Sequence, residues 1–390
     1  MSVFFAVLSF SLSVALGLLL LVVLVVLHEL GHAIAARRNG VTVEEFGIGF
    51  PPQAWSKKLK NGTRFSLNWL PLGGFVKLKG EHDSDKLPGS YGAVSLWSKT
   101  KILLAGVVMN WLAAAAIFTA LALVGIPKIL PNQFSVSQDS QIITQPVAVA
   151  AVAPGSPAAA VGLKQGDQLL AVAGRTITSP ESLYAATRDN AGKRVTILYR
   201  RTGTETALQV TLRPSGAAAN GYLGAVPRQG QFIRSTWSAP VVGVGLTAQF
   251  TKLTFESLGN LVIDLVRGVA SKFSSNAAVR QAGDKALSDA NAGVAGPLGI
   301  LGVIFPAAKQ AGWVMLLFLT GIISLTLAVM NILPIPALDG GRLFVTLLFR
   351  AIKQPLTKQR EDKIHTTGFA ALMVLVLLIT VLDVGKFIAR

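Results

Sequence analysis

The chain has 390 residues, of which 51% are hydrophobic and only 14% are charged, and its mean hydropathy is +0.54. That balance excludes an ordinary soluble protein of this length, and the absence of cysteine excludes disulfides and thiolate metal sites. A formal net charge of +17 fits either nucleic-acid binding or the basic loops of a membrane protein. Because no nucleic-acid-binding motif is visible, we expect a protein of the lipid bilayer with no nucleic-acid partner.

The first predicted element is a membrane-spanning helix. Residues 1–27 carry no charge, and the run is long enough to cross a hydrocarbon core about 30 Å thick. A cleavable signal peptide would have a basic start, a shorter apolar core and a small-residue cleavage site, and none of these precedes His28. We therefore expect the helix to be retained.

The end of this helix carries the sequence HELGH, from His28 to His32. Histidines at i and i+4 lie on one helical face and can share a zinc ion, and Glu29 beside the first ligand can take a proton from zinc-bound water. Ionisable groups near membrane depth are costly and need a partner, although snorkelling side chains at a helix end are the alternative. If the helix continues to Arg37 and Arg38, His32 lies about 7–8 Å inside that basic boundary.

A β-rich stretch separates the first two spans. Residues 65–79, FSLNWLPLGGFVKLK, predict two short β segments joined at PLGG, and hence a small membrane-associated β-hairpin. The second predicted span is Ile102–Ile126, which is uncharged and flanked by lysines. Residues 1–126 are thus expected to form the first two transmembrane helices with a cytoplasmic hairpin loop.

Residues 147–213 follow the element order of a PDZ domain. A helix of small residues, a strand-turn-strand at GLKQGDQLLAVAGRTI, a second helix and alternating closing strands succeed one another. We therefore predict an inserted α+β domain between the second and third spans.

The remaining chain has two parts. In 232–310, the uncharged stretches 236–251 and 291–308 are interrupted by Gly and Pro, which favours interfacial or re-entrant segments. Between them, 252–272 has the apolar spacing of a helix lying on the membrane surface. Residues 312–390 contain the third and fourth predicted spans, Gly312 to about Leu333 and Thr366–Leu382.

Basic residues near the span ends predict the orientation. The first ten residues have no lysine or arginine. Basic residues that follow the first and third spans are Arg37, Arg38, Lys57, Lys58, Lys60, Arg342, Arg350, Lys353, Lys358 and Arg360. The positive-inside rule then places the loops 33–100 and 338–365 in the cytoplasm, and both termini and the segment 127–311 outside.

A third metal ligand is expected, because a catalytic zinc commonly takes three protein ligands and one water. His82 and His365 lie in polar segments typical of a solvated surface. Asp339 lies where the third span ends, after Pro334 and Pro336 break the helix and expose backbone that membrane depth tolerates only inside protein or beside water. We predict Asp339 as the third ligand; a simple helix cap before GGRLF is the alternative.

Together, HELGH, NILPIPALDGG (331–341) and the PDZ-like segment resemble the site-2 protease family of zinc intramembrane metalloproteases. The bacterial branch that cleaves membrane-anchored anti-sigma factors is the most similar. FGIGFPP, LPLGGFVKLKGE (70–81) and AGVVMNWLAAA (105–115) also match, so the resemblance covers nearly the whole chain. It implies that His28, His32 and Asp339 hold one Zn²⁺ per chain and that Glu29 is the catalytic base.

The same resemblance implies how substrate is handled. Asn331 and the segment Pro334–Pro336 would help to hold substrate. An edge strand at Gly74, Phe75 and Val76 would hold the unwound substrate chain by strand addition, unless the hairpin is a plain cytoplasmic one. Substrates would be single-span proteins of the inner membrane, already shortened by another protease. The best-known proteobacterial relatives have two PDZ domains where we find one, and whether it binds peptide ends or filters by size stays open.

We therefore expect a polytopic α-helical membrane protein with about four transmembrane helices, an inserted extracytoplasmic PDZ domain and a small membrane-associated β-hairpin. Its predicted activity is that of a zinc endopeptidase acting inside the bilayer. The main rival is an inactive membrane adaptor, but such a protein would be expected to lose Glu29 or a ligand. A metal transporter would need more intramembrane carboxylates and histidines than these spans contain.

Overall fold

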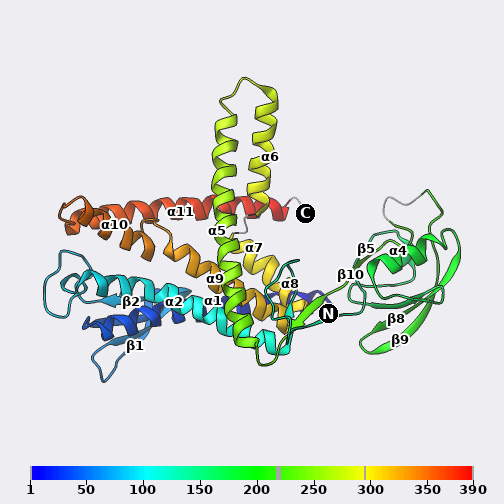
Figure 1. Cartoon of the computed structure of the whole chain (residues 1–390), viewed down its shortest axis with the longest axis horizontal. Coiled ribbons are helices and arrows are strands. Elements are labelled where there is room, and N and C mark those ends of the chain that lie inside the picture. Colours follow the sequence, from blue (N-terminus) through cyan, green and yellow to red (C-terminus); the bar gives the residue numbers. More distant parts are fainter. Residues whose placement is uncertain (1, 217–220, 294–295, 389–390) are drawn as a thin grey trace. The chain divides into compact units, whose positions relative to one another are not determined.

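The computed structural model describes residues 2–216, 221–293 and 296–388. It divides into two compact units, Met1–Ala122 together with Ala239–Arg390, and Leu123–Ser238. The second unit is therefore an insertion in the first. Figure 1 shows that the first unit is built mainly of helices and the second mainly of strands.

Four helices of the described chain are long and apolar enough to cross a membrane, in agreement with the predicted number. They are α1 (Ser2–Arg38), α2 (Leu96–Val124), α9 (Trp313–Ile332) and α11 (Lys358–Ile388). Large apolar side chains such as Phe10 of α1 and Leu377 of α11 are exposed, as expected of helices that face lipid.

Small residues bring the spanning helices into close contact. A Cβ atom on Gly31 of α1 would lie 2.5 Å from the carbonyl oxygen of Ala105 in α2, so only glycine permits this approach. Further along α2, the ring of Phe118 packs 5.7 Å from those of Phe250 and Phe318, which belong to other helices. The bundle is thus held by tight backbone packing at one end and by an aromatic cluster at the other.

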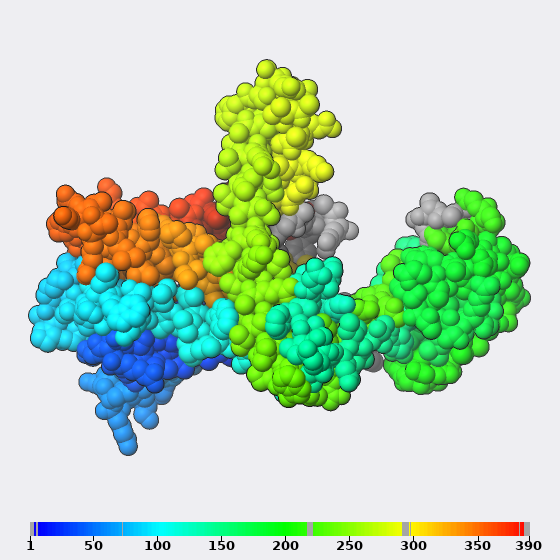
Figure 2. Space-filling view, viewed as in Figure 1, coloured from blue at the N-terminus to red at the C-terminus, as the bar shows by residue number. Residues whose placement is uncertain are grey.

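The helix α5 (Ala239–Ser271) joins the segments 236–251 and 252–272, which were predicted from the sequence as two separate elements. Its first half packs on the bundle, where the indole N–H of Trp111 donates to Thr251 Oγ1 at 3.2 Å. Its second half pairs with α6 (Ala277–Gly293), and an ion pair joins Lys272 to Asp284. Figures 1 and 2 show this pair projecting from the bundle.

Short helical segments complete the first unit. They are η1 (Tyr91–Ala93), α7 (Pro297–Gly299), the π-helical η3 (Ile300–Ile304), α8 (Phe305–Gln310) and α10 (Asp339–Ala351). The stretch Ile300–Gln310 is apolar but too short to span a membrane. It packs on α1, where a Cβ atom on Gly17 would lie 2.8 Å from the ring of Phe305.

The strands β1 (Val43–Lys58) and β2 (Arg64–Leu78) are long and bent, and together they form one small sheet. The first part of β1 pairs with both arms of β2, because Gly47 is paired with Phe75 and also with Ser66. The bend between the two arms lies near PLGG, as predicted, but the predicted hairpin of 65–79 is wrong: the two arms pair with β1 and not with each other. Among the described strands, the arm 74–78 pairs only with β1, and its other edge is free of strand pairing.

The second unit contains two antiparallel sheets. The larger has the order β10-β5-β6-β8-β9, with β7 paired to β6. Its strands are β5 (Ala148–Val152), β6 (Gln168–Val172), β7 (Arg175–Thr176), β8 (Arg194–Arg201), β9 (Thr204–Thr211) and β10 (Ala225–Arg228). The helices are α3 (Pro157–Ala160) and α4 (Pro180–Arg188), and the smaller sheet consists of β3 (Ile126–Pro127), β11 (Gln231–Arg234) and β4 (Gln141–Thr144).

The larger sheet extends beyond the predicted boundary at residue 213. Its core runs from Val147 to Leu223, and β10 pairs with β5 at the pairs Ala225–Val152 and Val226–Ala151. The sequence pattern missed β10 because the strand is only four residues long and contains a proline. The compact domain therefore needs residues up to 228.

Candidate metal centre

Three side chains from opposite ends of the chain converge inside the bundle. His28 Nε2 lies 3.0 Å and His32 Nε2 lies 3.2 Å from Asp339 Oδ2, and the two Nε2 atoms are 3.1 Å apart. Both histidines are less than 10% exposed. Within the described chain, these three residues form the one group of His, Asp and Glu ligand atoms close enough to hold a metal ion.

Helix periodicity positions the histidines, whereas a strained turn positions the aspartate. Ala337 has φ +83°, a left-handed conformation that is rare for a residue with a Cβ atom. Cβ atoms on Gly340 and Gly341 would lie 2.2 and 1.9 Å from backbone carbonyl oxygens of the preceding turn. The two glycines after Asp339 therefore let the start of α10 fold back tightly against the end of α9.

Asp339 is ionised in this setting. Burial opposes its charge, but the hydrogen bonds and positive potential of the two imidazoles, when these are protonated, outweigh burial and hold the pKa of Asp339 below its usual value. The cluster thus presents a carboxylate oxygen beside two imidazole nitrogens.

The backbone of α2 lines the histidines, which the sequence did not predict. His32 Nδ1 donates to the carbonyl oxygen of Ile102 at 2.7 Å, and since a carbonyl only accepts, the Nε2 atom of a neutral His32 carries a lone pair. A Cβ atom on Gly106 would lie 2.5 Å from His32 Nε2 and 2.6 Å from His28 Nε2. The glycine at 106 within an apolar span was a signal that the sequence offered, whereas the Ile102 carbonyl left none.

Glu29 lies beside this cluster without belonging to the group of three ligand atoms. Its carboxylate lies near the backbone N–H of Val76 and is close enough to both histidines and Asp339 to interact electrostatically with them. A Cβ atom on Gly74 would lie 3.6 Å from Glu29 Cγ. The arm of β2 predicted to bind substrate therefore runs directly past the predicted base.

Comparison with known proteins agrees with this geometry. The profile of peptidase family M50 matches residues 16–375. The chain belongs to this family.

Relatives cover almost the whole chain. A protein of Clostridium perfringens with the words zinc metalloprotease in its name is 30% identical over 93% of this chain and 95% of its own length. A protein of Fusobacterium nucleatum with the same words in its name is 29% identical over 96% of this chain and 97% of its own length. Zinc metalloprotease RasP of Geobacillus kaustophilus is 25% identical over 93% of this chain and 96% of its own length. The resemblance to site-2 proteases is confirmed, and the chain is a zinc metalloprotease of this membrane family.

The donor set fits the zinc ion of family M50. Two imidazole nitrogens and one carboxylate are a known set for catalytic zinc, and they leave a fourth position for water. The candidate ligand atoms all lie within 4.8 Å of one another. The missing Cβ atom of Gly106 keeps the space beside both Nε2 atoms clear.

The other residues predicted to hold substrate lie on the segment that leads to Asp339. The side chain of Asn331 donates to the carbonyl oxygen of Leu327 in its own helix, at 3.0 Å. Pro334 is exposed, and Pro336 packs on α11, where a Cβ atom on Gly368 would lie 2.4 Å from it. The contacts described for these residues are with α9 and α11, and none is with Glu29.

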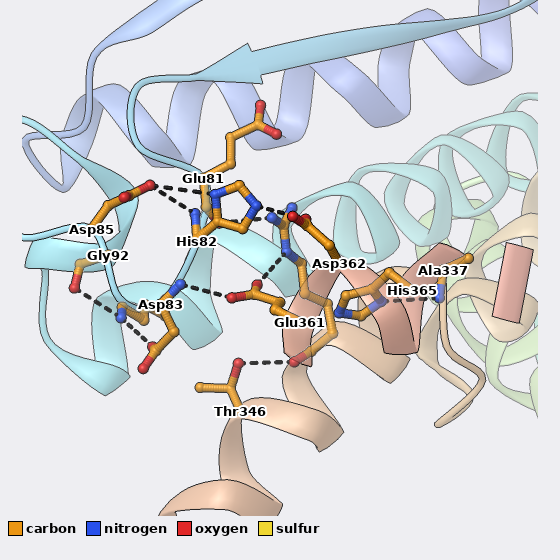
Figure 3. A network of polar contacts seen from close by, with 12 residues as sticks. Glu81, His82, Asp83, Asp85, Gly92, Ala337, Thr346, Glu361, Asp362 and His365 are labelled. Atoms are coloured by element: carbon orange, nitrogen blue, oxygen red, sulfur yellow. Dashed lines mark hydrogen bonds and ion pairs between the residues drawn. The ribbon is translucent and has the colours of Figure 1, made fainter. Parts of the chain in front are cut away.

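His82 and His365, predicted to be solvated surface residues, are half-buried in the structure. Figure 3 shows both in a polar network, in which His82 Nε2 lies 2.8 Å from Asp362 Oδ1 and His365 Nδ1 accepts from the N–H of Ala337 at 3.2 Å. Their partners lie 280 and 28 residues away in sequence, so no local pattern reveals them. The network lines a cavity of about 380 Å³ that reaches Asp339.

Proposed function

We propose that the protein hydrolyses peptide bonds within or beside the transmembrane segments of membrane-anchored regulators, such as anti-sigma factors, in the inner membrane. The observation that supports this most is the convergence of His28 and His32, from a helix of spanning length, with Asp339, which follows a second such helix, and with Glu29 beside them. An inactive adaptor would have no need to keep all four residues in this arrangement.

The side chains have distinct tasks in this reaction. His28, His32 and Asp339 hold the zinc ion, which when bound polarises the scissile carbonyl and lowers the pKa of water towards about 7. Glu29 takes a proton from the attacking water and delivers it to the leaving amine. The nearby Val76 N–H would orient the Glu29 carboxylate for both transfers.

The free edge of β2 supplies a means of presenting the substrate. Amides in a transmembrane helix are bonded within that helix, so the substrate must unwind before its backbone is accessible. In the proposal, unwound substrate adds as a strand along Gly74–Val76, whose other edge is bonded to β1. Because this arm contacts Glu29, an added strand passes the base.

The orientation is also part of the proposal. Lysine and arginine are concentrated between the first two spans and after the third, which favours a cytoplasmic location for both loops. We expect a reporter that works only outside the cytoplasm to be active when it is inserted after Arg213. A reporter that works only in the cytoplasm should be active when it is inserted near Lys58. The reverse pattern would contradict the orientation and the proposed access of substrate.

We propose that residues 147–228 form a PDZ domain that screens substrates. Its groove, about 670 Å³, is lined by residues of α4 and β10, among them Glu181, Tyr184 and Val226, and β10 is an end strand of its sheet. A peptide end can add to such an edge, but a domain at the outer face can equally exclude bulky substrates. We expect exclusion to dominate, so that substrates must first be shortened by another protease.

A deletion designed on the structure distinguishes these roles. The backbone N–H of Gln145 donates to the carbonyl of Gly230 at 2.8 Å, so a short Gly-Ser link can replace residues 146–229 without opening the smaller sheet. We expect the shortened protein to keep zinc and to cleave substrates with larger external domains. Zinc-loaded protein that cleaves nothing would instead assign the domain to substrate presentation.

The proposed substrate class is tested by co-expression with a tagged library of single-span membrane proteins. Intact protein is compared with Glu29→Gln, and terminal fragments are measured by mass spectrometry. We expect fragments that end within or near transmembrane segments in the intact sample alone. Cuts confined to soluble domains would contradict intramembrane cleavage, although they would leave the metalloprotease assignment intact.

A further inference from the structure

Three residues on one face of α2 lie beside the two histidines of α1. Ile102, Gly106 and Asn110 are spaced i, i+4 and i+8, so they form a single stripe on the helix. Ile102 accepts from His32 Nδ1, and Gly106 leaves room beside both rings. At the far end of the stripe, the side-chain amide of Asn110 faces His28 Nδ1, with Nδ2 at 3.4 Å.

Asn110 is buried and its amide is not fully paired. The residue is 1% exposed, and within the described structure its Oδ1 has no hydrogen-bond partner. Its backbone carbonyl accepts from Ser324 Oγ of α9 at 2.8 Å, which fixes this turn of α2 against a second spanning helix. An unpaired buried carbonyl oxygen is unfavourable, so its retention calls for an explanation.

The chemistry of a zinc-bound histidine explains why the Asn110 oxygen is kept at this buried position. A neutral imidazole that binds zinc through Nε2 must carry its proton on Nδ1, and that N–H needs an acceptor when it is buried. Rotation of the Asn110 amide about its Cβ–Cγ bond exchanges Oδ1 and Nδ2 within nearly the same volume. The exchanged amide then accepts from His28 Nδ1–H through the oxygen that otherwise lacks a partner.

We propose that Asn110 is the positioning residue of His28: its Oδ1 accepts the Nδ1 proton, fixes the ring and selects the tautomer whose Nε2 binds zinc. In this proposal α2 provides a hydrogen-bond acceptor for the Nδ1–H of each ligand. The Ile102 carbonyl accepts from His32, and the Asn110 side-chain oxygen accepts from His28. The role assigned to Asn110 rests on the metal centre of the proposed function. Because it concerns zinc affinity and not the substrate, the experiments can refute the Asn110 role and the proposed substrate class separately.

Two substitutions of similar size test the role. Asn110→Leu cannot accept a proton, and we expect the zinc affinity of the purified full-length protein to fall about 10–100-fold, as for other partners of metal-bound histidines. Asn110→Asp restores an acceptor and should bind zinc about as tightly as the unsubstituted protein. Affinity is measured by competition with a chelator, and the Co²⁺ absorption spectrum of each variant reports the ligand geometry.

A packing role predicts the opposite ranking, because leucine suits a buried site and a carboxylate does not. Zinc affinity retained by Asn110→Leu, or lost by Asn110→Asp alone, would therefore overturn the proposal. Ser324→Ala is the matched control: it removes the other hydrogen bond of Asn110, and a purely structural effect would reproduce the loss seen with leucine.

A measurement on the unsubstituted protein decides the matter if Asn110→Leu does not fold. The chain has only 4 histidines, so the spectrum of ¹⁵N-histidine-labelled, zinc-loaded protein is simple. We expect two zinc-bound side chains, both with a protonated Nδ1, and a hydrogen-bonded Nδ1–H signal for His28. A His28 that binds zinc through Nδ1, or whose Nδ1–H has no acceptor, would refute the assignment.

Discussion

Glu29→Gln is expected to keep nearly full zinc occupancy and to lose at least about 10²–10⁴-fold of peptide hydrolysis, the usual contribution of general acid–base catalysis. Its side chain lies outside the three-ligand group, so metal binding does not depend on its charge. Glutamine has nearly the same shape and preserves the local packing beside Val76, but its amide cannot take the proton of water. The measurements are metal content per purified protein and cleavage of one model transmembrane substrate.

Asp339→Asn provides the contrast, because it alters a ligand and nearly preserves its shape. Zinc affinity should fall together with activity, and high added zinc should restore part of both. The Oδ2 atom that both imidazoles face at 3.0 and 3.2 Å loses its negative charge in this variant. If Glu29→Gln lost its zinc while Asp339→Asn kept both zinc and activity, the assigned roles would be wrong.

Gly106→Ala is expected to have a comparable effect without touching any ligand. The added methyl group would lie 2.5 Å from His32 Nε2 and 2.6 Å from His28 Nε2, so the rings or α2 must shift. A displacement of about 1 Å at a catalytic centre costs roughly 10²-fold in rate, and zinc content should fall as well. Both are measured as for Glu29→Gln.

Gly259→Ala on α5 is the matched control for that substitution. A Cβ atom there meets nothing within 4 Å, and replacing a helical glycine stabilises a helix by roughly 0.5–1 kcal/mol. Zinc content and activity should therefore be unchanged. Normal zinc binding by Gly106→Ala would mean that α2 does not press against the ligand rings as the structure has it.

The parts of the site predicted from sequence are those with a local signature. His28 and His32 follow from helical spacing at the end of an apolar run, and Asp339 follows from a helix broken by prolines. The Ile102 carbonyl leaves no such signature, because every residue has a backbone carbonyl and only the helix packing selects one. The polar partners of His82 come from a helix near the other end of the chain and were missed for the same reason.

Hydropathy likewise predicts the spanning helices better than the segments between them. Apolar runs of the required length define all four candidate spans. The continuous course of α5 was not predicted, since its two halves differ in character: one packs on the bundle through Phe250 and the other presents residues such as Val262 and Val266 at the surface. Tertiary packing, which the pattern of one segment does not contain, decides where such a helix ends.

The distance in sequence between the ligands has a consequence during synthesis. His32 and Asp339 are separated by 307 residues, so the centre cannot close until most of the chain has left the ribosome. At about 5–20 residues per second, that interval is roughly 15–60 s. Nascent or prematurely terminated chains already contain the histidine pair and the base, yet they lack the carboxylate that completes the site. A chain of this design cannot hold its metal with all three ligands until its own translation is nearly finished.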